Sequence, residues 1–247
     1  MANFHSRSNS FPSQSHPVTE CVEDHLRRLR ASEATSTSST SICANLASLR
    51  DLHEGVNNMI QMPSIQQALS NEQGQSWMNE LLDGSLKLVD LCEFSREIVS
   101  LTKESIQDLE SSIRRNRGET ATSDDIKTYV TSKKKINKMV NKCIKNLKSF
   151  NKGSKALPDI EFGIMLKETE ALNFSVLKSV LTVVSGGNGK SRQQSWSFFS
   201  KSTQTSRVHS EIEDLCSFNI KEIEEGLESL FRSLIKTRVS LLNVISH

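Results

Sequence analysis

The sequence predicts an all-α fold, an antiparallel bundle of long amphipathic helices that follows a disordered Ser-rich N-terminal tail. Three observations lead to this class. Apolar residues recur at steps of three and four over long stretches, only 4 Pro and 10 Gly interrupt 247 residues, and no stretch alternates polar and apolar residues as a strand would. Hydrophobic residues make up 36% of the chain and charged residues 24%, which is typical of a domain with a buried core.

The first 41 residues differ in composition from the rest. Residues 1–17 are rich in Ser and hold no acidic side chain, which is typical of a tail without a core. A short helix is expected around Val18–Arg30, and the low-complexity run Ser32–Ser41 predicts a linker. We therefore divide the chain into a Ser-rich tail, short helix and linker at 1–41 and a helical bundle domain at 42–247.

Helical periodicity begins at Ile42. One apolar stripe continues until Pro63 stops the helix, and a further short turn of helix is expected at Ser64–Ser70. The strongest stripe follows between Leu81 and Ile113. A helix of this length would extend about 50 Å, enough to form the spine of a bundle.

Three more helices complete the predicted bundle. The stripe over 126–150 has a lysine-rich opposite side, the next helix is expected over 159–185, and the last from about 207 to 245, after a loop at 186–206. Such helices bury their stripes most economically against antiparallel neighbours. The alternative is that a partner chain covers the stripes in a coiled coil.

Charge is segregated along the chain although its net charge is only +2. Residues 113–155 hold 13 basic and 3 acidic side chains, whereas residues 51–110 hold 3 basic and 11 acidic ones. Side-by-side packing of these two segments would neutralise much of the field inside the bundle, and the remaining lysines would form a solvated face.

The exposed side of the lysine-rich helix is the first candidate site. Lys134, Lys138, Lys142 and Lys145 lie away from the apolar stripe, where they could contact the phosphates of an anionic membrane surface. Nucleic acid is the less favoured polyanion, because aromatic residues that could stack on bases make up only 5% of the chain.

The N-terminal tail carries the second candidate site. Arg7, Ser8, Ser10 and Pro12 follow the pattern Arg-Ser-x-Ser-x-Pro. If Ser10 is phosphorylated, an arginine cluster of a 14-3-3 adaptor can clamp the phosphate while the proline turns the peptide out of the groove. The pattern predicts a phosphoprotein with a regulatory tail.

No set of residues predicts catalysis, a metal site or a cofactor. The single, widely spaced cysteines favour reduced core thiols over disulfides or zinc; they are Cys21, Cys43, Cys92, Cys143 and Cys216. His53 lies on an apolar stripe, where a packed core histidine is expected, and Gly-Lys-Ser at 189–191 misses the glycine spacing of a phosphate-binding loop. We expect a non-enzymatic protein, although catalytic side chains could still converge in space.

Targeting signals are weak. Residues 1–20 contain no apolar run of a secretory signal, and the longest apolar-rich run, Leu172–Val184, is too short and too polar to span a bilayer. We expect an intracellular, cytoplasmic protein. Plastid import, suggested by the Ser-rich and acid-poor start, and the membrane periphery remain open alternatives.

Several short stretches resemble one plant family. They are Phe4-His5-x-Arg7-Ser8-Asn9-Ser10-Phe11-Pro12-Ser13, Leu26-x-Arg28-Leu29-Arg30, Gln66-Gln67-Ala68-Leu69, Glu80-Leu81-Leu82-Asp83-Gly84-Ser85-Leu86 and Leu241-Leu242-Asn243-Val244-Ile245-Ser246. In this order they resemble a plant-specific family, a domain of unknown function related to the Bypass proteins. The resemblance implies an all-helical, non-enzymatic regulatory or interaction protein linked to root and shoot development. It implies no catalytic or ligand-binding residue.

Overall fold

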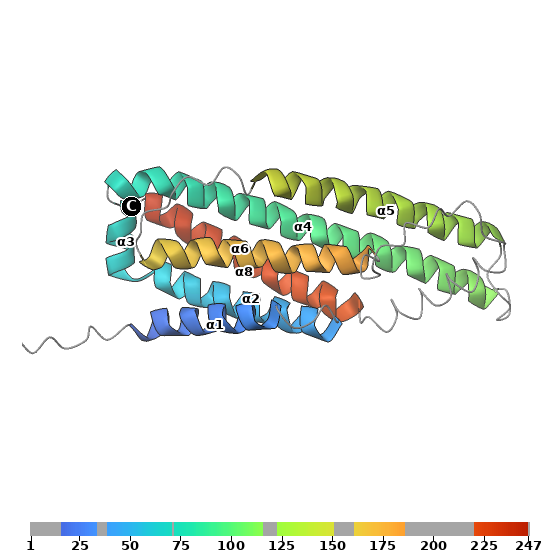
Figure 1. Cartoon of the computed structure of the whole chain (residues 1–247), viewed down its shortest axis with the longest axis horizontal. Helices are drawn as coiled ribbons and strands as arrows, with labels where there is room; N and C mark the ends of the chain where they lie inside the picture. The colour runs from blue at the N-terminus through green and yellow to red at the C-terminus, as the bar shows by residue number, and fades with distance from the viewer. Residues whose placement is uncertain are drawn as a thin grey trace, which may run out of the picture.

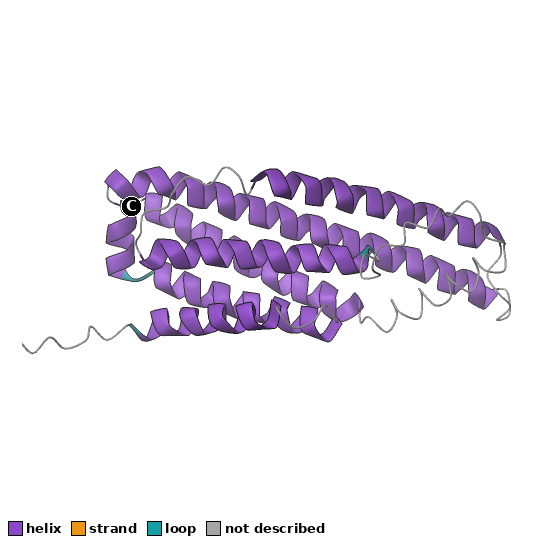
Figure 2. Cartoon of the chain, in the orientation of Figure 1, coloured by secondary structure: helices purple, strands orange, loops and turns teal. Residues whose placement is uncertain are grey.

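The computed structural model describes residues 16–33, 39–70, 72–115, 123–150, 161–185 and 220–246. All regular structure within these ranges is α-helical, as Figure 2 shows, which confirms the predicted class. The helices are α1 (Pro17–Glu33), α2 (Ser39–Ile60), α3 (Pro63–Ser70), α4 (Glu72–Arg115), α5 (Ser123–Phe150), α6 (Glu161–Val184) and α8 (Ile220–Ser246).

The long helices lie side by side, and those that follow one another along the chain run in opposite directions (Figure 1). α8 packs against both α2 and α4, α1 packs on α2, and α5 and α6 pack on α4. The 44 residues of α4 give it a length of about 66 Å, so it is the spine that the sequence predicts. Together with α5, its C-terminal part extends beyond the other helices in Figure 1.

Most helix boundaries agree with the predicted ones. α2 ends at Ile60 and α3 begins at Pro63, as expected from the proline. The predicted linker Ser32–Ser41 is wrong at both ends, because α1 continues to Glu33 and α2 begins at Ser39. Hydroxyl residues are compatible with the first turn of a helix, where their oxygens can cap backbone N–H groups. Residues 1–15 of the predicted tail 1–17 and the first part of the last predicted helix, 207–219, lie outside the described residues. Pro17, the last residue of that predicted tail, is already the first residue of α1.

α1 shares the core of the helices that follow it. Its residues Val22, Leu26 and Leu29 are fully buried and belong to the main apolar cluster. A Cβ atom added at Gly55 of α2 would lie 2.9 Å from Val22 Cγ2, so α1 and α2 approach each other closely at this glycine. The helix in segment 1–41 therefore packs directly on the helices of segment 42–247.

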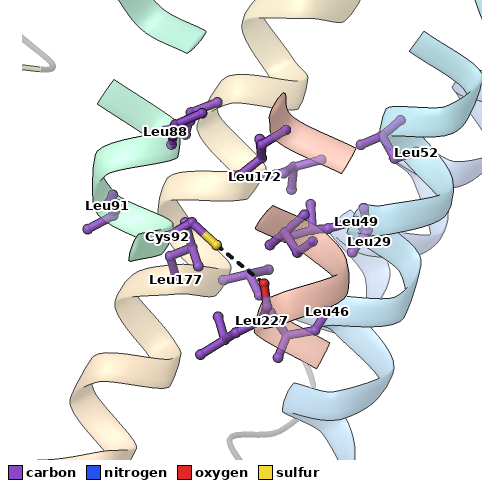
Figure 3. Close-up of a cluster of buried hydrophobic side chains, with 14 of the residues drawn as sticks. Leu29, Leu46, Leu49, Leu52, Leu88, Leu91, Cys92, Leu172, Leu177 and Leu227 are labelled. Carbon is purple, nitrogen blue, oxygen red and sulfur yellow. Dashed lines mark hydrogen bonds between the residues drawn. The ribbon is translucent and has the colours of Figure 1, made fainter. Parts of the chain in front are cut away.

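The main core lies where α2, α4, α6 and α8 meet (Figure 3). Leu46 of α2, Leu88 of α4, Leu177 of α6 and Leu227 of α8 are buried there. Cys92 Sγ donates a hydrogen bond of 3.6 Å to the Leu227 carbonyl oxygen, shown dashed in Figure 3. The stripes predicted from the 3/4 spacing thus cover one another within the chain.

A second, smaller cluster holds the outer part of α4 against α5. It consists of Ile106 and Leu109 of α4 with Ile126 and Tyr129 of α5, all buried. Ile220, the first residue of α8, packs against the same cluster. We call Ile106–Arg115 and Ser123–Val130 the α4–α5 arm.

The cysteines of the described residues are free thiols in three different environments. Cys92 is buried, and burial raises the pKa of its thiol to about 12. Cys43 and Cys143 are half-buried beside the main core. The core prediction is wrong for Cys21, which lies on the exposed side of α1. Cys216 lies outside the described residues.

Candidate anionic-surface interface

α5 has two chemically distinct sides. Ile136 and Val140 belong to the buried main core, and Ile126 and Tyr129 to the core of the arm, so this side faces α4. At about 100° per residue, Lys134, Lys138, Lys142 and Lys145 fall within an arc of about 80° on the opposite side of the helix. The four lysines predicted as a site therefore share one side of α5.

This side is wider than the sequence analysis proposed. Lys127 and Lys135 project from the same half of the helix, and all six side chains are exposed. We call the six the lysine face: Lys127, Lys134, Lys135, Lys138, Lys142 and Lys145. Lys127 lies nearest the start of α5, where its Nζ pairs with Asp124 Oδ1 at 2.9 Å.

The other five lysines of this face have no acidic partner among the described residues. α4 and α5 do pack side by side, and Asp90 of α4 borders the same groove as Lys142 of α5, but no ion pair joins the two side chains. The helices turn their apolar sides toward each other, and their charged side chains lie at the edges of this contact. The sequence predicts that the acids of 51–110 neutralise the lysines of 113–155. Ion pairs with these five lysines do not provide that neutralisation.

The ion pairs of α4 connect it to α8 instead. Arg96 pairs with Glu228, and Lys103 pairs with Glu224. The guanidinium of Arg96 also lies over the Phe231 ring, 4.7 Å from its centroid. These contacts use basic residues of α4 and acidic residues of α8, so they involve no side chain of the lysine face of α5.

A buried polar network links three helices near the main core. The distance from His53 Nε2 of α2 to Asn173 Oδ1 of α6 is 3.2 Å. The distance from His53 Nδ1 to Thr237 Oγ1 of α8 is also 3.2 Å. Asn173 Nδ2 donates to the Thr169 carbonyl oxygen at 2.7 Å. All four residues are buried, so the network satisfies polar groups that would otherwise be costly to bury.

Burial also fixes the charge of His53. Loss of solvation lowers the pKa of its imidazole from 6.5 to about 4, although the hydrogen bond with Asn173 opposes the shift. The ring is therefore neutral at pH 7. Since the Asn173 amide nitrogen already donates to Thr169, Asn173 Oδ1 accepts from Nε2–H, which leaves Nδ1 without a proton beside Thr237 Oγ1. The Thr237 hydroxyl also lies 3.0 Å from the Ser233 carbonyl oxygen, so Nδ1 and this carbonyl share its one proton. The predicted packed core histidine is confirmed.

Glu170 of α6 lies close to this network. His53 and Glu170 both line a cavity of about 50 Å³ between the helices. Burial raises the pKa of the Glu170 carboxyl, and nearby Lys87 opposes that shift. A Cβ atom at Gly84 would lie 3.0 Å from Glu170 Oε1, so this glycine makes room for the carboxyl group.

Arg7, Ser8, Ser10 and Pro12 lie outside the described residues, as does the glycine-rich stretch at 186–191. Within the described ranges, no three His, Cys, Asp or Glu side chains gather as a metal site would require. None of the described helices combines the length and the apolarity needed to cross a membrane.

A comparison with protein families shows the family of the chain. The model of the family described as Protein BPS1 matches residues 45–219 and 203–244. The chain belongs to the Protein BPS1 family. This confirms the Bypass-related resemblance of the short sequence stretches. No curated protein and no solved structure matches the chain.

Some of the candidate sites lie within the residues that the BPS1 family model matches, and one lies before them. The lysine face and the His53 network lie within the matched residues, whereas the Arg-Ser-x-Ser-x-Pro pattern precedes residue 45. The two interhelical partners of His53 were missed in the sequence analysis. Asn173 is a polar residue inside an apolar-rich run, and Thr237 lies on the buried side of α8. Polar residues that interrupt an apolar stripe are the sequence signal that could have revealed both partners.

Proposed function

We propose that this BPS1-family protein is a non-enzymatic regulatory and interaction protein of plant development, linked to roots and shoots, and that it contacts anionic membrane surfaces through the lysine face. Family membership supports the developmental role. The observation that carries the membrane contact is the row of five exposed lysines without an acidic partner among the described residues.

The chemistry of the lysine face favours a membrane over nucleic acid. Each lysine near an anionic leaflet contributes about 1 kcal/mol of attraction at moderate salt, so several along one helix can hold a protein reversibly. Tyr129 is the aromatic residue of α5 whose side chain the structure describes, and it is buried against α4. The described part of this face thus offers no ring on which a base could stack.

Sedimentation with vesicles tests the membrane contact. The protein is expected to sediment with phosphatidylserine-containing vesicles at low salt and to be released at high salt, because screening weakens the attraction. Combined replacement of Lys134, Lys138, Lys142 and Lys145 with Glu should weaken binding by at least about 100-fold, since it removes four attractive charges and adds four repulsive ones.

A matched variant controls for net charge. Lys167, Lys178, Lys221 and Lys236 are also exposed but lie on α6 and α8. Their combined replacement with Glu changes the total charge by the same amount and is expected to preserve most of the binding. The membrane contact is wrong if vesicles bind neither protein at low salt, or if both variants lose binding equally.

The tail motif has its own test. We expect a peptide of residues 4–13 phosphorylated on Ser10 to bind a 14-3-3 protein at least about 10-fold more tightly than the unphosphorylated peptide, because the phosphate forms charge-assisted hydrogen bonds with arginines. Fluorescence anisotropy measures both affinities. Equal affinities, or equal binding by an Arg7→Ala phosphopeptide, would rule out this mode of recognition.

A further inference from the structure

A groove runs between α4 and the C-terminal part of α5. It lies between Lys87–Phe94 of α4 and Met139–Leu147 of α5 and has a volume of about 440 Å³. Volumes of roughly 300 to 1,000 Å³ are typical of sites for small molecules. The groove is separate from the buried His53 network, which lies among α2, α6 and α8.

The walls of the groove are largely apolar. Leu91 forms a nearly buried part of the wall, and half-buried Phe94, Met139, Cys143 and Leu147 complete it. Apolar side chains that line an open groove remain in contact with water. A ligand with an alkyl chain would remove both its own surface and theirs from water, which is favourable in proportion to the area buried.

The polar residues of the groove favour a negatively charged head group. Lys87 and Lys142 contribute two ammonium groups, Asp90 one carboxylate and Asn146 an amide. Lys142 belongs to the lysine face, is exposed, and has no acidic partner among the described residues. A carboxylate placed beside Lys142 would thus gain an ion pair without breaking one at that side chain.

We propose that this groove binds a single-chain anionic amphiphile such as a fatty acid, with its alkyl chain along Leu91, Phe94 and Met139 and its carboxylate at Lys142. The contributing part of α4, Lys87–Phe94, covers two helical turns, or about 12 Å. This length is too short to seat a partner helix over several turns but suits one alkyl chain. The site does not require α5 to lie on a membrane.

The position of Cys143 in the wall provides a direct assay. Full-length protein is treated with N-ethylmaleimide, with and without monomeric dodecanoate below its critical micelle concentration, and labelling of each cysteine is followed by peptide mass spectrometry. Saturating dodecanoate is expected to slow labelling of Cys143 at least about 10-fold. Half-buried Cys43 and exposed Cys21 lie outside the groove and serve as internal controls whose labelling should not change.

Two comparisons test the head-group assignment. Dodecyltrimethylammonium has the same alkyl chain with a positive head and should protect Cys143 at least about 10-fold less well. Lys142→Glu should raise the dodecanoate concentration needed for protection by at least about 10-fold, whereas Lys134→Glu, two helical turns away, should not. Unchanged labelling of Cys143 by dodecanoate overturns the proposal, and so does equal protection by the cationic amphiphile. No vesicle is present, so this outcome is independent of the sedimentation result.

Discussion

Acid is expected to destabilise this protein through His53 well before its carboxylates are protonated in bulk. At pH 7 the imidazole is neutral in the folded state and mostly neutral in the unfolded state, where its pKa is 6.5. Between pH 6.5 and about 4 the unfolded chain binds a proton that the buried ring does not, so the free energy of unfolding falls as the pH falls. The depressed pKa corresponds to a loss of about 3 kcal/mol, complete once the pH is below about 4.

Denaturant unfolding at pH 7, 5.5 and 4.5 measures this loss, and a His53→Gln variant isolates it. Glutamine retains an amide donor and an acceptor for Asn173 and Thr237 but does not titrate in this range. Glu170 acts in the opposite direction, because its raised pKa means that the folded state gains stability as the pH falls. Since Glu170 is present in both proteins, the difference between their pH profiles belongs to His53.

His16→Gln is the matched control for this experiment, because His16 is exposed at the start of α1. The fall in stability between pH 6.5 and 4.5 that is assigned to His53 should remain in His16→Gln. The assignment to His53 fails if the wild type and His53→Gln lose stability in parallel between pH 6.5 and 4.5.

The sequence was sufficient to predict which residues lie inside the helices and roughly where most helices end. The 3/4 spacing identified Leu88, Cys92 and Val99 as one side of a long helix, and all three are buried. Pro63 marked a boundary because its ring cannot continue a helix. Both signals are local, since periodicity and backbone chemistry act within a few residues of the chain.

Pairing between distant segments could not be read in the same way. His53 meets Asn173 and Thr237, which lie 120 and 184 positions away, and no pattern within α2 specifies them. The charges of α4 and α5 show the same limit. The sequence revealed opposite charges in neighbouring segments but not that Asp90 and Lys142 would border one groove without forming an ion pair. The groove was missed because it depends on how two helix surfaces fit, not on either helix alone.

Leu227→Ala is expected to cause the largest loss of stability among single apolar truncations discussed for this chain. Leu227 is fully buried where α8 meets α2 and α4, next to Cys92 and Leu46 (Figure 3). Its truncation removes buried methyl and methylene groups and leaves a cavity that neighbouring helices fill only in part. The expected decrease in the free energy of unfolding is about 3 to 4 kcal/mol, measured by urea denaturation at pH 7.

Leu242→Ala provides a control in the same helix, because Leu242 is 41% exposed and its truncation should cost less than about 1 kcal/mol.

Tyr129→Ala then separates the arm from the main core. The cluster of Tyr129, Ile106 and Leu109 holds α4 against α5, with the start of α8 packed against it, so its loss should raise amide hydrogen exchange mainly in the α4–α5 arm. Leu227→Ala should instead accelerate exchange in α2, α4 and α8 together. Identical exchange patterns in the two variants would mean that the arm and the main core unfold as one unit, and that the lysine face depends on the whole bundle for its shape.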